Sequence, residues 1–262
     1  MRLLSKLLIL FISLTAYNLS AAELVSLKTR GDVTQKFILI KPVNPTATVI
    51  LFSGGKGILK LSSLFGSPSL GAGQTNFLVR SRKLFADKGL MVAVVDAPSD
   101  KQKNKGMFKG FRSSGEHVTD IDAVITYLKK QADIPVWLVG TSRGTESAAH
   151  VTINSSQQIA GLVLTASMSK RNKSGKAVTM MDLTKITQPT LIASHENDGC
   201  ANTPPKGAEI IKEKLVNASS ADVIFFKGGK ETGDPCKGLS YHGFLGIEDK
   251  VVDKIYEFIA TN

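Results

Sequence analysis

The stretch PVWLVGTSRG, residues 135–144, runs from an apolar strand pattern directly into a serine flanked by glycines. Gly140, Ser142 and Gly144 match G-x-S-x-G, a motif that chance alone would produce roughly 0.2 times in a chain of this composition. A helical pattern follows at once. A sharp strand-to-helix turn of this kind needs glycines beside the serine, and it lifts the serine hydroxyl above the sheet edge among backbone N–H groups. The segment therefore predicts a nucleophilic serine at Ser142.

Strand-like and helix-like patterns alternate on both sides of this segment. Continuous apolar strands separated by amphipathic helices predict a mostly parallel sheet covered on both faces. The expected strands are 24–28, 36–40, 48–52, 91–95, 136–139, 160–164, 190–193 and 221–226. The expected helices are 76–88, 116–131, 146–153, 203–216 and 247–259, with Thr203 as the N-cap of the fourth. The longest irregular stretches (53–75, 98–114, 167–188 and 227–246) each follow a strand, so they are expected at the carboxyl edge of the sheet, where such folds bind ligands.

The composition describes an ordinary globular protein. Of the 262 residues, 42% are apolar and 21% are charged, which excludes a disordered chain. The net charge is +11. Basic charge can favour nucleic acid, anionic lipid or acidic substrates.

Residues 1–22 have the pattern of a secretory signal peptide. Arg2 and Lys6 precede an apolar run, and small residues end at Ala22. An uncleaved N-terminal anchor is the alternative. The sequence thus predicts a periplasmic or secreted protein with one domain over residues 23–262, no stable membrane insertion after signal removal, and no nucleic-acid partner. No later apolar run has the length of a membrane span.

A nucleophilic serine needs a base, and the base needs an orienting acid. Asp198 follows a predicted strand, with Glu196 as a rival acid in the same loop. The four histidines are His117, His150, His195 and His242. Only His242 lies in the loop between the last strand and the last helix.

The order Ser142, Asp198, His242 resembles that of the α/β-hydrolase superfamily, and the likeness extends from Thr48 to the C-terminus. The resemblance implies a central sheet of about eight strands flanked by helices, and a Ser-His-Asp triad that hydrolyses an ester or similar acyl bond through an acyl-enzyme. Segment 167–188 is short and polar where many relatives insert a lid, so no large lid domain is expected.

The resemblance also implies an oxyanion hole built from two backbone N–H groups. One belongs to Arg143, which follows the nucleophile. The other comes from the loop after strand 48–52, where related enzymes often have His-Gly and this chain has Ser53-Gly54. That departure leaves Gly55 and Lys56 as alternative donors.

Two cysteines lie beside the proposed acid and base. In a triad the Asp and His side chains touch, so the loops that carry Cys200 and Cys236 would be neighbours. In an oxidising compartment this arrangement predicts a Cys200–Cys236 disulfide, with two unpaired thiols as the alternative.

The sequence contains no motif for a nucleotide cofactor or a structural metal, so no cofactor and no metal ligands are expected. A basic run, Lys101–Arg112, follows strand 91–95. This run is either a solvated loop or the rim of an active site that attracts anionic substrates. The expected partner is therefore a small-molecule ester, with an anionic ester as one alternative.

Two other functions stay open: a catalytically silent scaffold that binds a ligand or protein, and a peptidase or thioesterase. The sequence does not indicate the oligomeric state.

Overall fold

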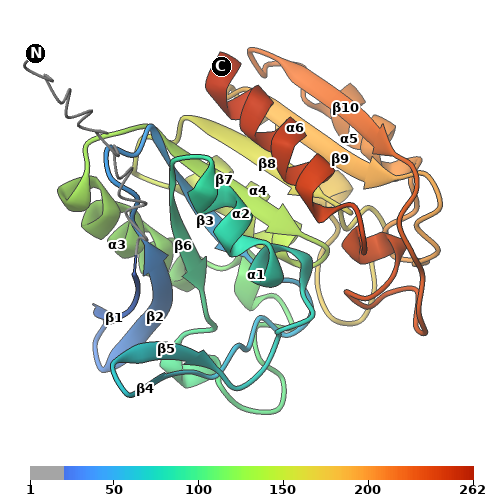
Figure 1. The fold of residues 1–262 in the computed structure, drawn as a ribbon. Coiled ribbons are helices and arrows are strands. Elements are labelled where there is room, and N and C mark those ends of the chain that lie inside the picture. The colour runs from blue at the N-terminus through green and yellow to red at the C-terminus, as the bar shows by residue number, and fades with distance from the viewer. Residues whose placement is uncertain (1–20) are drawn as a thin grey trace, which may run out of the picture.

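The computed structural model describes residues 21–262. The predicted signal peptide, residues 1–22, lies outside the described residues except for its last two alanines. Ala22 is the first residue of strand β1 (Figure 1), where it pairs with Ile40.

The centre of the structure is an eight-stranded sheet in the order β1-β2-β6-β3-β7-β8-β9-β10. Its strands are β1 (Ala22–Arg30), β2 (Val33–Ile40), β3 (Ala47–Phe52), β6 (Leu90–Val95), β7 (Val136–Thr141), β8 (Gly161–Thr165), β9 (Thr190–His195) and β10 (Ala221–Phe226). β2 is antiparallel to both of its neighbours, β1 and β6. The strands β6, β3, β7, β8, β9 and β10 all run parallel to one another. This arrangement confirms the predicted mostly parallel sheet of about eight strands.

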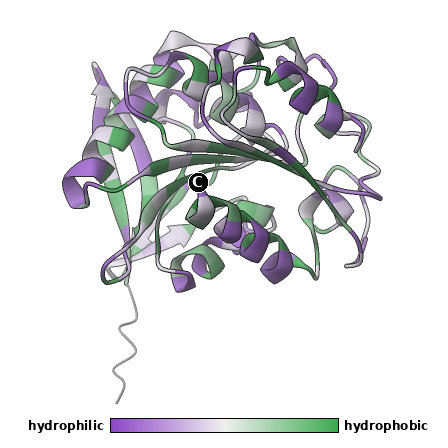
Figure 2. Ribbon diagram, turned by 90° about the horizontal axis from the view of Figure 1, so that it is seen from above, coloured by the Kyte–Doolittle hydropathy of each residue, from purple (hydrophilic) through white to green (hydrophobic). Residues whose placement is uncertain are grey.

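Helices cover both faces of the sheet (Figures 1 and 2). They are α1 (Phe77–Arg80), α2 (Arg82–Asp87), α3 (Gly115–Gln131), α4 (Gly144–Asn154), α5 (Gly207–Lys214) and α6 (Glu248–Thr261). Side chains alternate along each strand, so Val49 and Leu51 of β3 pack with α1, α2 and α6, while Ile50 and Phe52 pack with α3, α4 and α5. Apolar burial on both faces explains why the parallel strands appear in the sequence as unbroken apolar runs.

Three predictions about secondary structure were wrong in detail. The loop 53–75 contains a small hairpin, β4 (Leu61–Leu64) and β5 (Ser67–Leu70). The expected helix 76–88 is two helices that meet at Ser81. Helix α5 begins at Gly207 with Lys206 as its N-cap, so Thr203 does not cap it.

The remaining short helices are 3₁₀ turns: η1 (Ser99–Lys101), η2 (Phe111–Ser113), η3 (Val178–Met180), η4 (Leu183–Lys185) and η5 (Tyr241–Gly243). Segment 167–188, where a lid would be inserted, contains only η3 and η4 and an isolated bridge between Asn172 and Gly175. The predicted absence of a large lid domain agrees with this arrangement. Within residues 21–262, no helix has the length and apolar character needed to span a bilayer.

His117 of α3 is a neutral histidine packed inside the protein. It lies between the rings of Phe52 and Phe111, and neither of its ring nitrogens has a hydrogen-bond partner among the described residues. Burial, together with the smaller effect of the nearby charge of Arg112, lowers the pKa of His117 to about 3. Protonation of this side chain therefore favours the unfolded state.

We expect this histidine to make the protein less stable in acid. Because its pKa in the unfolded chain is about 6.5, the loss begins below that pH and reaches about 3 kcal/mol between pH 7 and pH 4. Urea unfolding across this range should show a steeper fall in the free energy of unfolding for the wild type than for His117→Leu. Any constant effect of the substitution on packing cancels in that comparison of slopes. Parallel pH profiles would contradict the assignment.

Candidate active site

Ser142 lies on a tight turn between β7 and α4, at the carboxyl end of a central strand. Its φ is +52°, a left-handed conformation that non-glycine residues rarely adopt. A Cβ on Gly144 would lie 2.0 Å from the carbonyl oxygen of Phe52, so only glycine fits where α4 begins against β3. The glycine after the serine thus has the steric role that the motif predicts.

The loop after β3 packs directly against Ser142. A Cβ on Gly54 would lie 3.0 Å from Ser142 Cβ and 3.5 Å from Asn76 Nδ2. Asn76 is the N-cap of α1, and its side-chain oxygen accepts hydrogen bonds from the N–H groups of Leu78 and Val79. The absence of a side chain at Gly54 therefore allows the predicted oxyanion loop to approach the serine.

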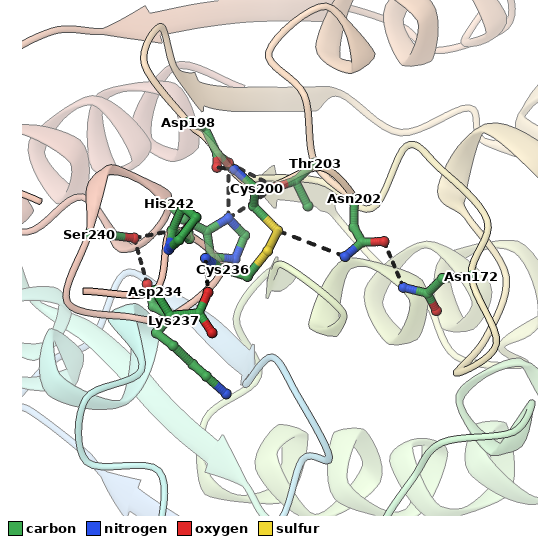
Figure 3. Close-up of a disulfide and its surroundings, with 11 residues drawn as sticks. Asn172, Asp198, Cys200, Asn202, Thr203, Asp234, Cys236, Lys237, Ser240 and His242 are labelled. Carbon is green, nitrogen blue, oxygen red and sulfur yellow. Dashed lines mark hydrogen bonds and ion pairs between the residues drawn. A yellow bond between two sulfur atoms is a disulfide. The ribbon is translucent and has the colours of Figure 1, made fainter. Parts of the chain in front are cut away.

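Asp198 and His242 form a buried pair (Figure 3). Asp198 Oδ2 lies 2.9 Å from His242 Nδ1, and the exposed fractions of the two side chains are 0% and 5%. Asp198 follows β9, and His242 lies in η5 between β10 and α6. Since an ionised carboxylate only accepts hydrogen bonds, the contact selects the imidazole tautomer with a proton on Nδ1. Nε2 is then left with the lone pair that a general base needs.

Thr203 is a site residue that the sequence did not reveal. Its hydroxyl donates to Asp198 Oδ2 at 2.9 Å and lies 3.0 Å from His242 Nδ1. The backbone N–H of Cys200 donates to the other carboxylate oxygen of Asp198, also at 2.9 Å. Thr203 precedes Pro204, a pattern typical of a helix N-cap. This local pattern gives no sign of the contact with His242, which lies 39 positions away.

The rival acid Glu196 and its neighbour His195 make other contacts. Glu196 is 41% exposed and pairs with Lys227 on the surface. His195 is fully buried, with Nε2 2.7 Å from the carbonyl oxygen of Gly228, and its ring stacks on Tyr241. His195 is therefore a structural histidine whose ring nitrogens are both engaged, since Nδ1 accepts from the N–H of Asn197.

The loop that carries His242 packs against the Asn76 side of the site. A Cβ on Gly238 would lie 2.0 Å from the carbonyl oxygen of Thr75, so the loop approaches the start of α1 closely. Arg80 of α1 donates to the carbonyl oxygen of Gly243, next to His242. Asn76 thus lies close both to Gly54 on the serine side and to Gly238 on the histidine side. In the described residues, no hydrogen bond joins the Ser142 hydroxyl to His242, and such contacts often tighten only when substrate binds.

The three candidate oxyanion donors all remain available. Within residues 21–262, the backbone N–H groups of Arg143, Gly55 and Lys56 donate no hydrogen bond. Gly55 is exposed and has φ +57°, and the turn at this point is closed by a bond from Gly57 N–H to the carbonyl oxygen of Gly54.

Arg112 is not part of a solvated loop, as one interpretation of the basic run predicted, but is fully buried. Its guanidinium donates to the carbonyl oxygens of Ser53 and Gly55 and to the hydroxyl of Ser147 on α4. It thereby ties the oxyanion loop to the helix that follows Ser142. Burial lowers the pKa of Arg112 to about 9, partly offset by the charge of Glu146.

The side chain of Arg143 connects the turn at Ser142 to the loop of the acid. It pairs with Glu146 at 3.0 Å and donates to Asn172 Oδ1 at 2.6 Å. Asn172 in turn donates to Asn202, which contacts the sulfur of Cys200 (Figure 3). Arg143 therefore acts as a structural cation whose charge is matched by a buried carboxylate.

Cys200 and Cys236 form a disulfide with their Cα atoms 4.6 Å apart, as predicted (Figure 3). The bond joins the loop that contains Asp198 to the loop that contains His242. Ser240 strengthens the second loop, because its buried hydroxyl lies within hydrogen-bond distance of the carbonyl oxygens of Pro235 and Lys237.

Removing the disulfide should cost about 3 to 4 kcal/mol in the free energy of unfolding, because the bond spans 36 residues and restricts the unfolded chain. We expect the Cys200→Ser, Cys236→Ser double variant to unfold at a lower urea concentration than the oxidised wild type. Dithiothreitol should shift the wild type toward the variant and leave the variant unchanged. Two free thiols in the unreduced, denatured wild type would overturn this prediction.

No group of three His, Cys, Asp or Glu side chains in residues 21–262 is placed to hold a metal ion. Two possible ligands lie near Asp198 in the sequence. His195 contacts the carbonyl oxygen of Gly228, and Cys200 forms the disulfide with Cys236.

No protein-family model matches the chain, and no curated protein matches it either. Solved structures do. An esterase from Pyrococcus furiosus aligns with a TM-score of 0.63 at 14% identity, covering 92% of each chain. A cold-adapted esterase from an Arctic intertidal metagenomic library aligns with a TM-score of 0.59 at 15% identity, covering 89% of this chain and 92% of its own.

A serine hydrolase without a lid from Xanthomonas campestris aligns with a TM-score of 0.58 at 14% identity, covering 91% of this chain and 94% of its own. Together with the strand order, these likenesses show that the chain has the α/β-hydrolase fold.

Proposed function

We propose that this protein is an exported serine hydrolase that cleaves carboxylic esters. The observation that carries the proposal is the buried Asp198–His242 pair, which lies at the same edge of the sheet as the strained turn at Ser142. The esterases among the structural neighbours support the same class of reaction. Export is supported by the signal-like residues 1–22 and by the disulfide, since disulfides persist in oxidising compartments.

In the proposed reaction, Ser142 Oγ attacks the acyl carbon while His242 Nε2 takes its proton. The N–H of Arg143 and that of Gly55 or Lys56 stabilise the negative charge on the acyl oxygen, and each such donor contributes about 3 kcal/mol. Protonated His242 gives the proton to the leaving alcohol. Water, activated by His242, then releases the acid from the acyl-enzyme. Asp198 stabilises the charged imidazole throughout.

The disulfide and Thr203 support this reaction through position. Both fasten the loop of Asp198 to the loop of His242, so the imidazole is oriented before substrate arrives. A pocket of about 620 Å³ over residues 53–60 is open to solvent and suits a small or short-chain ester.

Pre-steady-state kinetics with p-nitrophenyl acetate and longer p-nitrophenyl esters test the function. We expect turnover, with a burst of up to one equivalent of p-nitrophenol if deacylation is the slow step. Short acyl chains should be preferred, because no lid covers the pocket. Absence of turnover and of a burst with every ester would favour the alternative of a silent binding scaffold. Faster cleavage of thioesters or peptides would favour the other enzyme classes.

A further inference from the structure

Two basic pockets lie among the loops at the carboxyl edge of the sheet, where the turn at Ser142 also lies. The glycine-loop pocket, of about 620 Å³, is lined by the loop 53–60 and has four basic residues: Lys56, Lys60, Lys103 and Lys237. The Arg143 pocket, of about 700 Å³, also has four: Lys109, Arg171, Lys173 and Lys176. Neither lining contains an aspartate or a glutamate.

Each pocket has a lining residue close to the turn at Ser142 or to the side chain of the residue that follows it. Gly54 lines the glycine-loop pocket, and a Cβ there would lie 3.0 Å from Ser142 Cβ. Gly175 lines the Arg143 pocket, and a Cβ there would lie 2.6 Å from Arg143 Nη1. Phe108 of the first pocket and Lys109 of the second are adjacent in the chain, so this short segment separates the pockets. The guanidinium of Arg143 lies 5.8 Å from the ring of Phe108.

The positive charge in these pockets is not neutralised by the protein. In the part of the chain that the structure describes, none of the eight basic side chains forms an ion pair. Four acids near the pockets have other partners. Glu146 pairs with Arg143, and Asp100 pairs with Lys101 and Arg30. Asp96 accepts backbone N–H groups of the loop, and Asp234 accepts the N–H of Cys236. Like charges gathered without partners cost stability, and an anionic ligand would offset that cost.

We propose that the substrate is an ester with anionic groups, such as carboxylate or phosphate, on both sides of the scissile bond. One pocket binds the anion on the acyl side and the other binds the anion on the alcohol side. This proposal rests on the proposed esterase function and adds the class of substrate. The separation of the charges into two pockets distinguishes it from general attraction by a basic protein.

A matched set of four nitrophenyl esters tests the proposal, with an anionic group on neither side, on the acyl side, on the alcohol side or on both. At low salt we expect each anion to raise kcat/KM about tenfold over the neutral ester. The gain should shrink in 1 M salt, where the screening length falls from about 10 Å at 0.1 M to about 3 Å.

Two triple variants identify the pockets, one with Lys60, Lys103 and Lys237 changed to Gln and one with Lys109, Lys173 and Lys176 changed to Gln. Each variant should remove the increase in kcat/KM that an anion gives on one side of the ester only. The two variants should affect opposite sides, one the acyl side and the other the alcohol side. A control with Lys130, Lys214 and Lys250 changed to Gln loses the same charge from surface positions outside both pockets. It should keep both gains. The proposal would be overturned if the surface control lost as much of the increase in kcat/KM as the pocket variants. It would also be overturned if both pocket variants lost the increase on the same side, or if the anions gave the wild type no increase.

A binding experiment separates this proposal from the esterase function. Ser142→Ala protein, which needs no catalysis, is titrated with fluorescently labelled poly-L-glutamate and with labelled inorganic polyphosphate. Tighter binding of one polymer identifies carboxylate or phosphate as the preferred anion. Each pocket variant, made in the Ser142→Ala background, should weaken binding about tenfold relative to the surface control. If no ester is hydrolysed but this loss is seen, the esterase function fails and the anion sites stand. If neither polymer binds more tightly to Ser142→Ala than to the pocket variants, the anion sites fail.

Discussion

Replacing Ser142 or His242 by alanine should lower kcat for ester hydrolysis by about 10⁴-fold to 10⁶-fold, because a triad acts as one unit. The nucleophile cannot form an acyl-enzyme without the base, and the base has nothing to activate without the nucleophile. The double variant should therefore lose no more activity than the worse of the two single variants. Initial rates with p-nitrophenyl acetate give the comparison.

Two outcomes would contradict this account. One is a double variant whose loss equals the product of the two single losses, because independent effects multiply. The other is a Ser142→Ala protein that retains a tenth or more of wild-type activity. Circular dichroism and urea unfolding provide the control, since both side chains can be shortened without removing the packed core around them.

Replacing Asp198 by asparagine should lower kcat by about 10³-fold to 10⁴-fold. The amide can donate to His242 Nδ1 and so favours the tautomer that protonates Nε2, which removes the base. Glu196→Gln is the matched control, because Glu196 lies in the same loop and pairs with Lys227 on the surface. Its kcat should stay within about twofold of the wild type.

The reverse pattern, with Asp198→Asn active and Glu196→Gln inactive, would assign the acid to Glu196. In that case the 2.9 Å contact between Asp198 and His242 would be structural only.

The parts of the fold that follow apolar burial were predictable from the sequence. Strands β3, β6, β7 and β9 are buried along their whole length, so they appear as apolar runs of the correct position. The hairpin of β4 and β5 was not predicted, because only one of its eight strand residues is buried and its sequence is rich in serine. A helix was expected to continue through Ser81, yet the chain turns there between α1 and α2.

The candidate site was predictable where a local motif or the chain order specifies it, as at Ser142, Asp198 and His242. The residues that support these three were not predictable. Thr203 has the local pattern of a helix cap, and Arg112 has the local pattern of a solvated basic loop. Both residues have partners on other loops of the chain. Thr203 contacts Asp198 and His242. Arg112 donates to the carbonyl oxygens of residues 53 and 55. No local pattern in one sequence encodes such contacts.

The central claim is that Ser142 is a nucleophile activated by His242. Its most direct test is labelling of the native protein with a fluorophosphonate, followed by mass spectrometry of the intact protein and of its peptides. We predict one adduct per chain, located on Ser142, absent from Ser142→Ala and strongly reduced in His242→Ala. A native protein that remains unlabelled under conditions that label a control esterase, or an adduct on any other residue, would contradict the account.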